Sequence, residues 1–170
     1  MSDTPESWLN GPVEGVNPYL MPVAHALVQA RRDLAQVTAN LTVEELWDRP
    51  GGAASVGFHL QHIAGVLDRL CTYARGHELS TDQMRALRSE GQRGEPPADA
   101  AALLQGARAA IDSSLDQIRA TAPSSLLEPR PVGRKRLPSN VLGLLYHAAE
   151  HATRHAGQIV TTARILRGAA

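Results

Sequence analysis

The sequence has 170 residues, of which 43% are hydrophobic and 4% aromatic, and it contains one cysteine, so no disulfide can form within the chain. Its 17 basic and 17 acidic side chains give a formal net charge of +0. This balance argues against a nucleic-acid partner, because binding to a phosphate backbone rests on many Lys and Arg contacts. The sequence shows neither an apolar run of the ~18 residues that would span a membrane nor a signal peptide. We therefore expect one cytoplasmic domain over residues 1–170, without a membrane partner and with a loosely ordered segment at 1–16.

The first half of the chain carries two helix-start signals. Asn17 followed by Pro18 is typical of a helix start, and the apolar spacing that follows predicts a long helix to about Asn40. Thr42 and Glu45 have the spacing of a capping box, in which the two side chains satisfy each other's backbone amides. A short helix is therefore expected directly after the first long one.

Three further long helices follow. Ser55 is expected to cap the second, which ends near Arg75, directly before Gly76. A short polar helix covers 80–90, the third long helix covers 98–120, and Ser139 caps the fourth, which runs to about residue 166. Strand signals are nearly absent. The fold class predicted is all-α, a four-helix bundle with short accessory helices. Its unequal connections predict that the helices do not simply alternate up and down.

Three histidines on the last predicted helix are regularly spaced. His147, His151 and His155 are spaced by four residues, and each such step rotates a side chain by only about 40° around a helix. His155 falls inside the apolar stripe of this helix, His151 lies beside it and His147 lies at its edge. Buried imidazoles need partners. A shared metal ion would supply one, whereas ordinary hydrogen bonds to backbone or water are the alternative.

Such a metal site needs at least one more ligand from another helix. The remaining histidines are His25, His59, His62 and His77. On the second long helix His59 lies nearer the apolar stripe than His62, so periodicity alone slightly favours His59. His77 follows a helix-ending glycine and is expected to be exposed.

Two segments together are similar to a known family. The sequence SVGFHLQHIAG at 55–65 and the sequence HATRHAGQI at 151–159 resemble the DinB-like (DinB/YfiT) superfamily. The resemblance implies a helical bundle, often a homodimer, that binds a divalent ion such as Zn²⁺ or Ni²⁺. Matched to the family's motif, the ligands are His62, His151 and His155. On this point the resemblance overrides periodicity.

The resemblance also suggests a function. Characterised relatives include S-transferases and an isomerase that use low-molecular-weight thiols such as bacillithiol or mycothiol, and some metal-dependent hydrolases. The expected function is thus a metal-dependent enzyme acting on a small molecule, with a thiol S-transferase favoured. A hydrolase and a non-catalytic metal-binding or stress-response module are the alternatives. Three histidines would leave coordination positions open to water or substrate.

No catalytic side chain can be assigned from the sequence. Gln158 follows His155 and is either an outer contact of the site or a helix-packing residue, while Gly157 is expected to let another helix approach closely. Glu150 is expected on the surface. The basic run at 134–136 is either a solvated loop or a contact for an anionic substrate.

Overall fold

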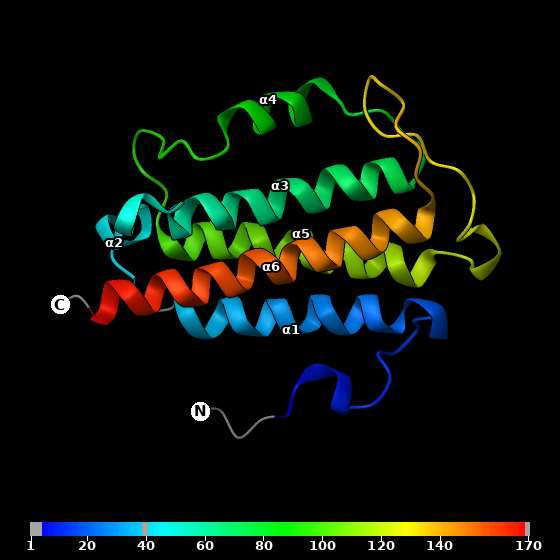
Figure 1. The fold of residues 1–170 in the computed structure, drawn as a ribbon, viewed down its shortest axis with the longest axis horizontal. Coiled ribbons are helices and arrows are strands. Elements are labelled where there is room, and N and C mark those ends of the chain that lie inside the picture. The colour runs from blue at the N-terminus through cyan, green and yellow to red at the C-terminus, as the bar shows by residue number, and fades with distance from the viewer. Residues whose placement is uncertain (1–4, 39–40, 169–170) are drawn as a thin grey trace.

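Six α-helices and four short 3₁₀ turns make up the regular structure of the described residues. The computed structural model describes residues 5–38 and 41–168. The helices are α1 (Met21–Thr38), α2 (Val43–Trp47), α3 (Val56–Ala74), α4 (Thr81–Ser89), α5 (Ala100–Ala120) and α6 (Val141–Gly168), and the 3₁₀ turns are Ser7–Leu9, Pro18–Leu20, Pro50–Gly52 and Pro123–Ser125 (Figure 1). In the described part of the chain no strand forms, and the predicted all-α class is confirmed.

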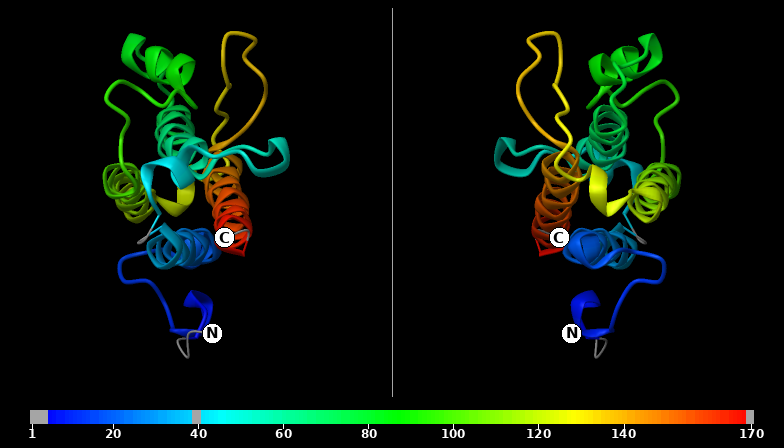
Figure 2. Two further views of the ribbon diagram at one scale, coloured as in Figure 1. Left: turned by 90° about the vertical axis from the view of Figure 1, so that its left-hand side faces the viewer. Right: turned by 90° about the vertical axis from the view of Figure 1, so that its right-hand side faces the viewer.

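The four long helices form a bundle with a square cross-section. Helix α3 packs against α5 and α6, and α1 packs against the same two helices from the opposite corner. The end-on views in Figure 2 show this arrangement, with α4 and the loop at 126–140 on one side of the bundle and the N-terminal segment on the other. The predicted four-helix bundle is therefore confirmed.

The helices do not alternate in direction. Figure 1 shows α3 and α5 running one way and α1 and α6 the other. Helix α3 can be followed by the parallel α5 because α4 carries the chain back along α3 before α5 begins. The unequal connections seen in the sequence thus correspond to a bundle that is not a simple meander, as expected.

Most predicted helix starts are confirmed by side-chain caps. Ser55 accepts a hydrogen bond from the Phe58 backbone amide at 3.1 Å, and Thr42 and Glu45 form the complete capping box. Asn17 accepts from the Leu20 amide, but the turn that it opens is 3₁₀, and α1 proper begins at Met21. The predicted end of this helix near Asn40 lies outside the described residues.

The predicted cap of the last long helix is wrong. Asn140, not Ser139, accepts the hydrogen bond from the Gly143 amide, at 2.7 Å. The reason is that the Ser139 carbonyl is already engaged by the Arg130 amide at 2.8 Å. Ser139 therefore belongs to the hairpin-like loop that precedes α6, and the helix starts one residue later.

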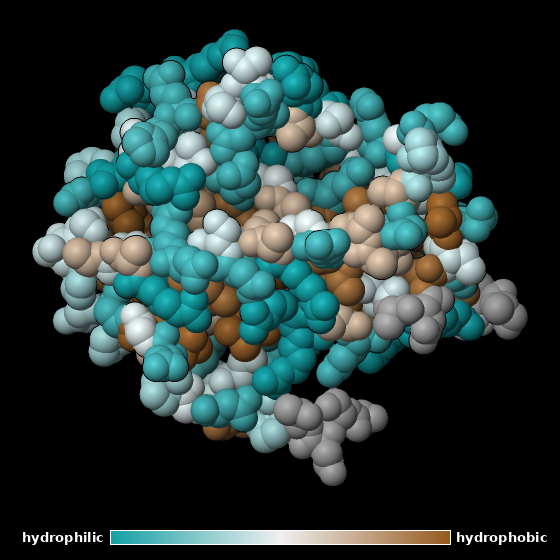
Figure 3. Space-filling view, turned by 180° about the vertical axis from the view of Figure 1, so that it is seen from behind, coloured by the Kyte–Doolittle hydropathy of each residue, from teal (hydrophilic) through white to brown (hydrophobic). Residues whose placement is uncertain are grey.

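The core lies between the four long helices. The predicted stripe of α3 faces inward, with Val56, Leu60, Ile63 and Leu67 fully buried. Seen from behind, the molecule is covered mostly by hydrophilic side chains, with apolar ones visible between them (Figure 3). Within the described residues, no helix combines the length and the apolar character that crossing a membrane requires.

Candidate metal centre

Three histidines from two helices converge at the junction of α3 and α6. His62 comes from α3, and His151 and His155 come from successive turns of α6. The Nε2 atom of His151 lies 2.9 Å from Nε2 of His62 and 3.1 Å from Nε2 of His155. The structure therefore brings together the three residues singled out by the family resemblance.

His62 is oriented by a carboxylate that the sequence analysis missed. Its Nδ1 lies 2.7 Å from Oε2 of Glu90, which follows the last turn of α4. The other carboxylate oxygen of Glu90 pairs with Arg69 of α3. A carboxylate at Nδ1 places the proton on that nitrogen, so the Nε2 lone pair of His62 is directed toward the other two histidines.

The close approach of Glu90 to α3 depends on a glycine. A Cβ added at Gly65 would overlap the Glu90 carboxylate and the Arg69 guanidinium. Glu90 has only 10% of its side chain exposed. Burial raises its pKa, but hydrogen bonds from His62 and Arg69 outweigh burial and hold the pKa below its ordinary value. Glu90 is therefore a fixed negative charge behind His62.

His59 takes a different place from the one that periodicity favoured. Its Nδ1 lies 2.9 Å from Nδ1 of His155, on the edge of that ring opposite to the converging Nε2 atoms. His59 is 4% exposed and its ring meets Phe58 edge-on, while Phe58 stacks on His62. His59 thus contacts a member of the cluster from outside it.

One ring nitrogen of His151, Nδ1, is buried without a hydrogen-bond partner among the described residues. The ring of His147 lies edge-on to the His151 ring, with centroids 5.2 Å apart, but His147 pairs with Glu150 instead. Glu150 also pairs with Arg154, so this carboxylate is occupied by two neighbours of its own helix.

Burial favours the neutral forms of His155, His151 and His59 by lowering their pKa values. It lowers the pKa of His155 to about 4, with added repulsion from the protonated forms of His62, His151 and His59 and from Arg154. The pKa values of His151 and His59 are also lowered, again first by burial and then by neighbouring positive charge. Neutral imidazoles are the form that binds metal ions.

The cluster fits a metal ion. Three nitrogens bound to one ion at ~2.0–2.1 Å would lie about 2.9–3.4 Å apart, depending on the coordination angle. The contacts of His151 Nε2 at 2.9 and 3.1 Å agree with this range. Without an ion, a proton on His151 Nε2 could be donated to only one of the two lone pairs that face it, on Nε2 of His62 and Nε2 of His155. A cation between the Nε2 atoms accounts for a convergence that hydrogen bonds satisfy poorly.

The other residues discussed from the sequence lie away from the cluster. Gln158 is exposed, and so is His77, as expected. The prediction for Gly157 is wrong, because a Cβ there would have no atom within 4 Å and no helix approaches it. His25 contacts the Gly11 carbonyl at 2.9 Å and so holds the N-terminal segment.

The fold and the site together define a class of protein, a four-helix bundle with three histidines converging between two of its long helices. The family model of the DinB superfamily matches residues 26–159. The chain therefore belongs to the DinB superfamily, and the resemblance seen in the two histidine segments is confirmed. None of the curated proteins matches the chain.

Proposed function

We propose that this protein is a divalent-metal-dependent enzyme whose ion is held by His62, His151 and His155. The proposal is supported by the distances between the three Nε2 atoms and by membership of a superfamily associated with metal sites. The ion favoured is Zn²⁺ or Ni²⁺, since imidazole nitrogen suits both.

The position of His59 favours a catalytic metal site over a structural one. A structural metal site is closed by four protein ligands, whereas a catalytic site keeps a position open. His59 contacts Nδ1 of His155 rather than joining the three Nε2 atoms. Across the described residues, the cluster that could hold an ion at these atoms contains three histidines and no fourth ligand. A substrate or water could therefore reach the ion.

An ion bound by three neutral nitrogens keeps its full charge and lowers the pKa of a water or thiol that it binds. The chain's own contribution is to hold the ligands in place. Glu90 fixes the ring orientation of His62, and Arg69 holds Glu90. His59 fixes the ring orientation of His155 in the same way, through its Nδ1 contact. These three contacts pre-organise the site before any ligand arrives.

The reaction favoured is transfer of a low-molecular-weight thiol to an electrophilic small molecule. Hydrolysis is commonly assisted by a general base such as a histidine or a carboxylate. Here Glu90 is occupied by His62 and Arg69, and Glu150 is occupied by His147 and Arg154. A thiol, being more acidic than water, has less need of a base. This difference favours the S-transferase over the hydrolase.

Two measurements test the proposal. Elemental analysis should find one divalent ion in the native protein and in His77→Ala, and little in His62→Ala, His151→Ala or His155→Ala. The native protein should then be assayed with bacillithiol, mycothiol and glutathione against a model electrophile, with and without chelator. Thiol-dependent, chelator-sensitive turnover supports the transferase. Bound metal without turnover in any assay would indicate the non-catalytic module, and thiol-independent ester or amide cleavage the hydrolase.

We also propose that the protein is a homodimer. Apolar and aromatic side chains line two adjoining grooves between α1 and α6, including Trp8, Pro22, Ala26 and Tyr146. Trp8 and Tyr146 are each 61% exposed, and a continuous exposed apolar patch marks a candidate interaction surface. The cytoplasmic location and the single domain over residues 1–170 stay predictions.

A further inference from the structure

A cleft in the described structure lies apart from the histidine cluster. It has a volume of about 830 Å³ and is bounded by the end of α3, by α4 and by the loop at 129–136. Figure 2 shows α4 and this loop standing on the same side of the bundle. None of the three clustered histidines lines the cleft. Its volume is in the range of small-molecule sites.

The loop wall of the cleft is held by backbone and side-chain hydrogen bonds. Val132 and Leu137 exchange two backbone hydrogen bonds, at 2.9 and 3.0 Å, which close a short hairpin. Arg130 ties this hairpin to the bundle, because its Nε donates to the Ala74 carbonyl at 3.0 Å and its guanidinium pairs with Glu128. The wall is therefore a fixed surface, and Arg130 is used in building it.

The two arginines at the tip of the hairpin differ from Arg130. Arg134 and Arg136 both line the cleft, and neither forms an ion pair with a carboxylate in the part of the chain that the structure describes. Glu78 also lines the cleft, but its single negative charge balances only one of the two arginines, so the cleft keeps an excess of positive charge. Lys135, between the two arginines, adds to it.

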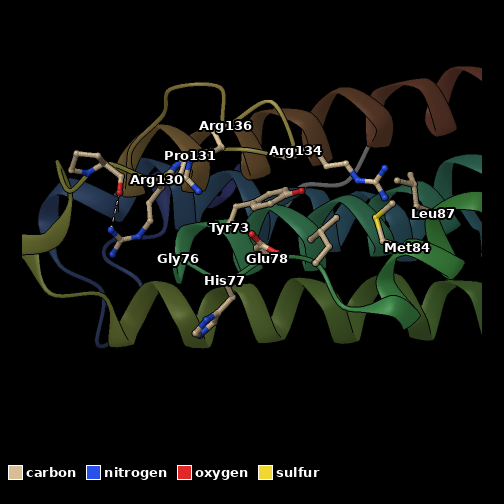
Figure 4. A pocket seen from close by; sticks show the side chains of 13 residues that line it. Tyr73, Gly76, His77, Glu78, Met84, Leu87, Arg130, Pro131, Arg134 and Arg136 are labelled. Atoms are coloured by element: carbon tan, nitrogen blue, oxygen red, sulfur yellow. Dashed lines mark hydrogen bonds between the residues drawn. The ribbon is translucent and has the colours of Figure 1, made fainter.

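The opposite wall is apolar. Tyr73 of α3 and Met84 and Leu87 of α4 line it, and Leu87 is 39% exposed. In Figure 4, Arg134 extends toward the end of the cleft where Met84 and Leu87 lie, with Tyr73 near the middle. The cleft thus places the unpaired guanidinium group of Arg134 beside an apolar surface, with the charge of Arg136 further along the same loop.

We propose that this cleft binds a small organic anion, with its charged group at Arg134, added attraction from the charge of Arg136, and its apolar body against Tyr73, Met84 and Leu87. Guanidinium groups bind carboxylates and phosphates through paired N–H donors. Apolar walls with a few placed charges are the usual composition of ligand sites. The site does not depend on the metal centre.

Three matched probes test the proposal on the full-length protein: 2-naphthoate, 2-naphthyl phosphate and the uncharged 2-naphthylmethanol. Binding is followed by amide chemical shifts in NMR titrations. At least one of the two anions should bind saturably and about tenfold or more tightly than the alcohol, with shifts confined to the end of α3, to α4 and to the hairpin. Which anion binds more tightly tells a carboxylate site from a phosphate site. Equal affinity for all three probes, or no saturable binding at millimolar concentration, would overturn the proposal.

A charge-matched pair of variants completes the test. Arg134→Gln with Arg136→Gln should weaken anion binding about tenfold and leave alcohol binding unchanged. Arg108→Gln with Arg164→Gln removes the same charge from exposed positions on α5 and α6 and should have no such effect. Equal loss in both pairs would mean a general charge effect and contradict the site. Binding should persist after chelation; if chelator abolishes it, the probe occupies the metal centre instead.

Discussion

His59 and His155 face each other through their Nδ1 atoms, which lie 2.9 Å apart. This contact leaves the Nε2 atom of His155 free to face His151. For Nε2 to present its lone pair to an ion, Nδ1 of His155 must carry the proton and His59 must accept it. The relationship makes His59 a positioning residue for the cluster rather than one of its ligands.

A substitution at His59 should therefore weaken metal binding without abolishing it. His59→Phe keeps a buried ring but removes the acceptor for His155. We expect metal affinity to fall about 10- to 100-fold, as is typical when an outer partner of a ligand is lost. Competition with a chromophoric chelator measures this loss. Complete absence of metal at saturating concentration, as expected for His155→Ala, would instead make His59 a ligand.

Loss of the negative charge at Glu90 should weaken the site through His62. Glu90→Gln preserves the shape of the side chain but removes the carboxylate that holds the His62 Nδ1 proton. A decrease in metal affinity of about 10- to 100-fold is expected, measured by the same competition. Glu150→Gln is the control, since Glu150 pairs with Arg154 and His147. If the two variants bind metal equally well, Glu90 has no positioning role.

Two glycine-to-alanine changes should differ in their effect on metal affinity. At Gly65 a methyl group would displace the Glu90 carboxylate, so Gly65→Ala should lower metal affinity in the same way as Glu90→Gln. At Gly157 a Cβ meets nothing within 4 Å, so Gly157→Ala should keep metal affinity and stabilise α6 by about 0.5–1 kcal/mol. Thermal unfolding and metal competition on both variants check this. Unchanged affinity in Gly65→Ala would contradict the packing described for Glu90.

The metal-free protein should lose stability as the pH falls from about 6.5 to 4. The pKa of His155 is lowered from 6.5 to about 4, so between these values the unfolded chain binds a proton that the folded chain does not. His59 and His151 act in the same direction. The unfolding midpoint should be highest above pH 6.5 and fall through this window. His155→Gln should flatten the profile, and His77→Ala should leave it unchanged; equal slopes in native protein and His155→Gln would refute the assignment.

Exposed aromatic side chains on the α1–α6 face should control dimer formation. Trp8→Ser combined with Tyr146→Ser should shift the protein toward a monomer in sedimentation equilibrium, because it removes the largest apolar surfaces of that face. Leu127→Ser is the control, since Leu127 is 74% exposed but lies in the loop before α6. A native protein that is monomeric at all tested concentrations would contradict the proposed dimer.

Local signals in the sequence were enough for the long helices and for two of the three clustered histidines. Apolar spacing and caps such as Ser55 and the Thr42–Glu45 pair depend on residues within a turn or two of one another, and these predictions hold. The i, i+4 spacing likewise places His151 and His155 on one face of a single helix. Helix geometry alone fixes that relationship, so no knowledge of the rest of the fold is needed.

Only the tertiary structure decided what faces this pair. Periodicity favoured His59 over His62, because it reports burial and not the nitrogen that a ring presents to another helix; the family resemblance supplied His62. Glu90 lies 28 residues from His62 in sequence, and no local pattern links them, since their contact depends on how α4 folds back over α3. The sequence by itself determined which side chains share a helix face. The packing of α4, α3 and α6 determined which atoms meet, because contacts between helices follow from their relative position and rotation, which a local repeat does not specify.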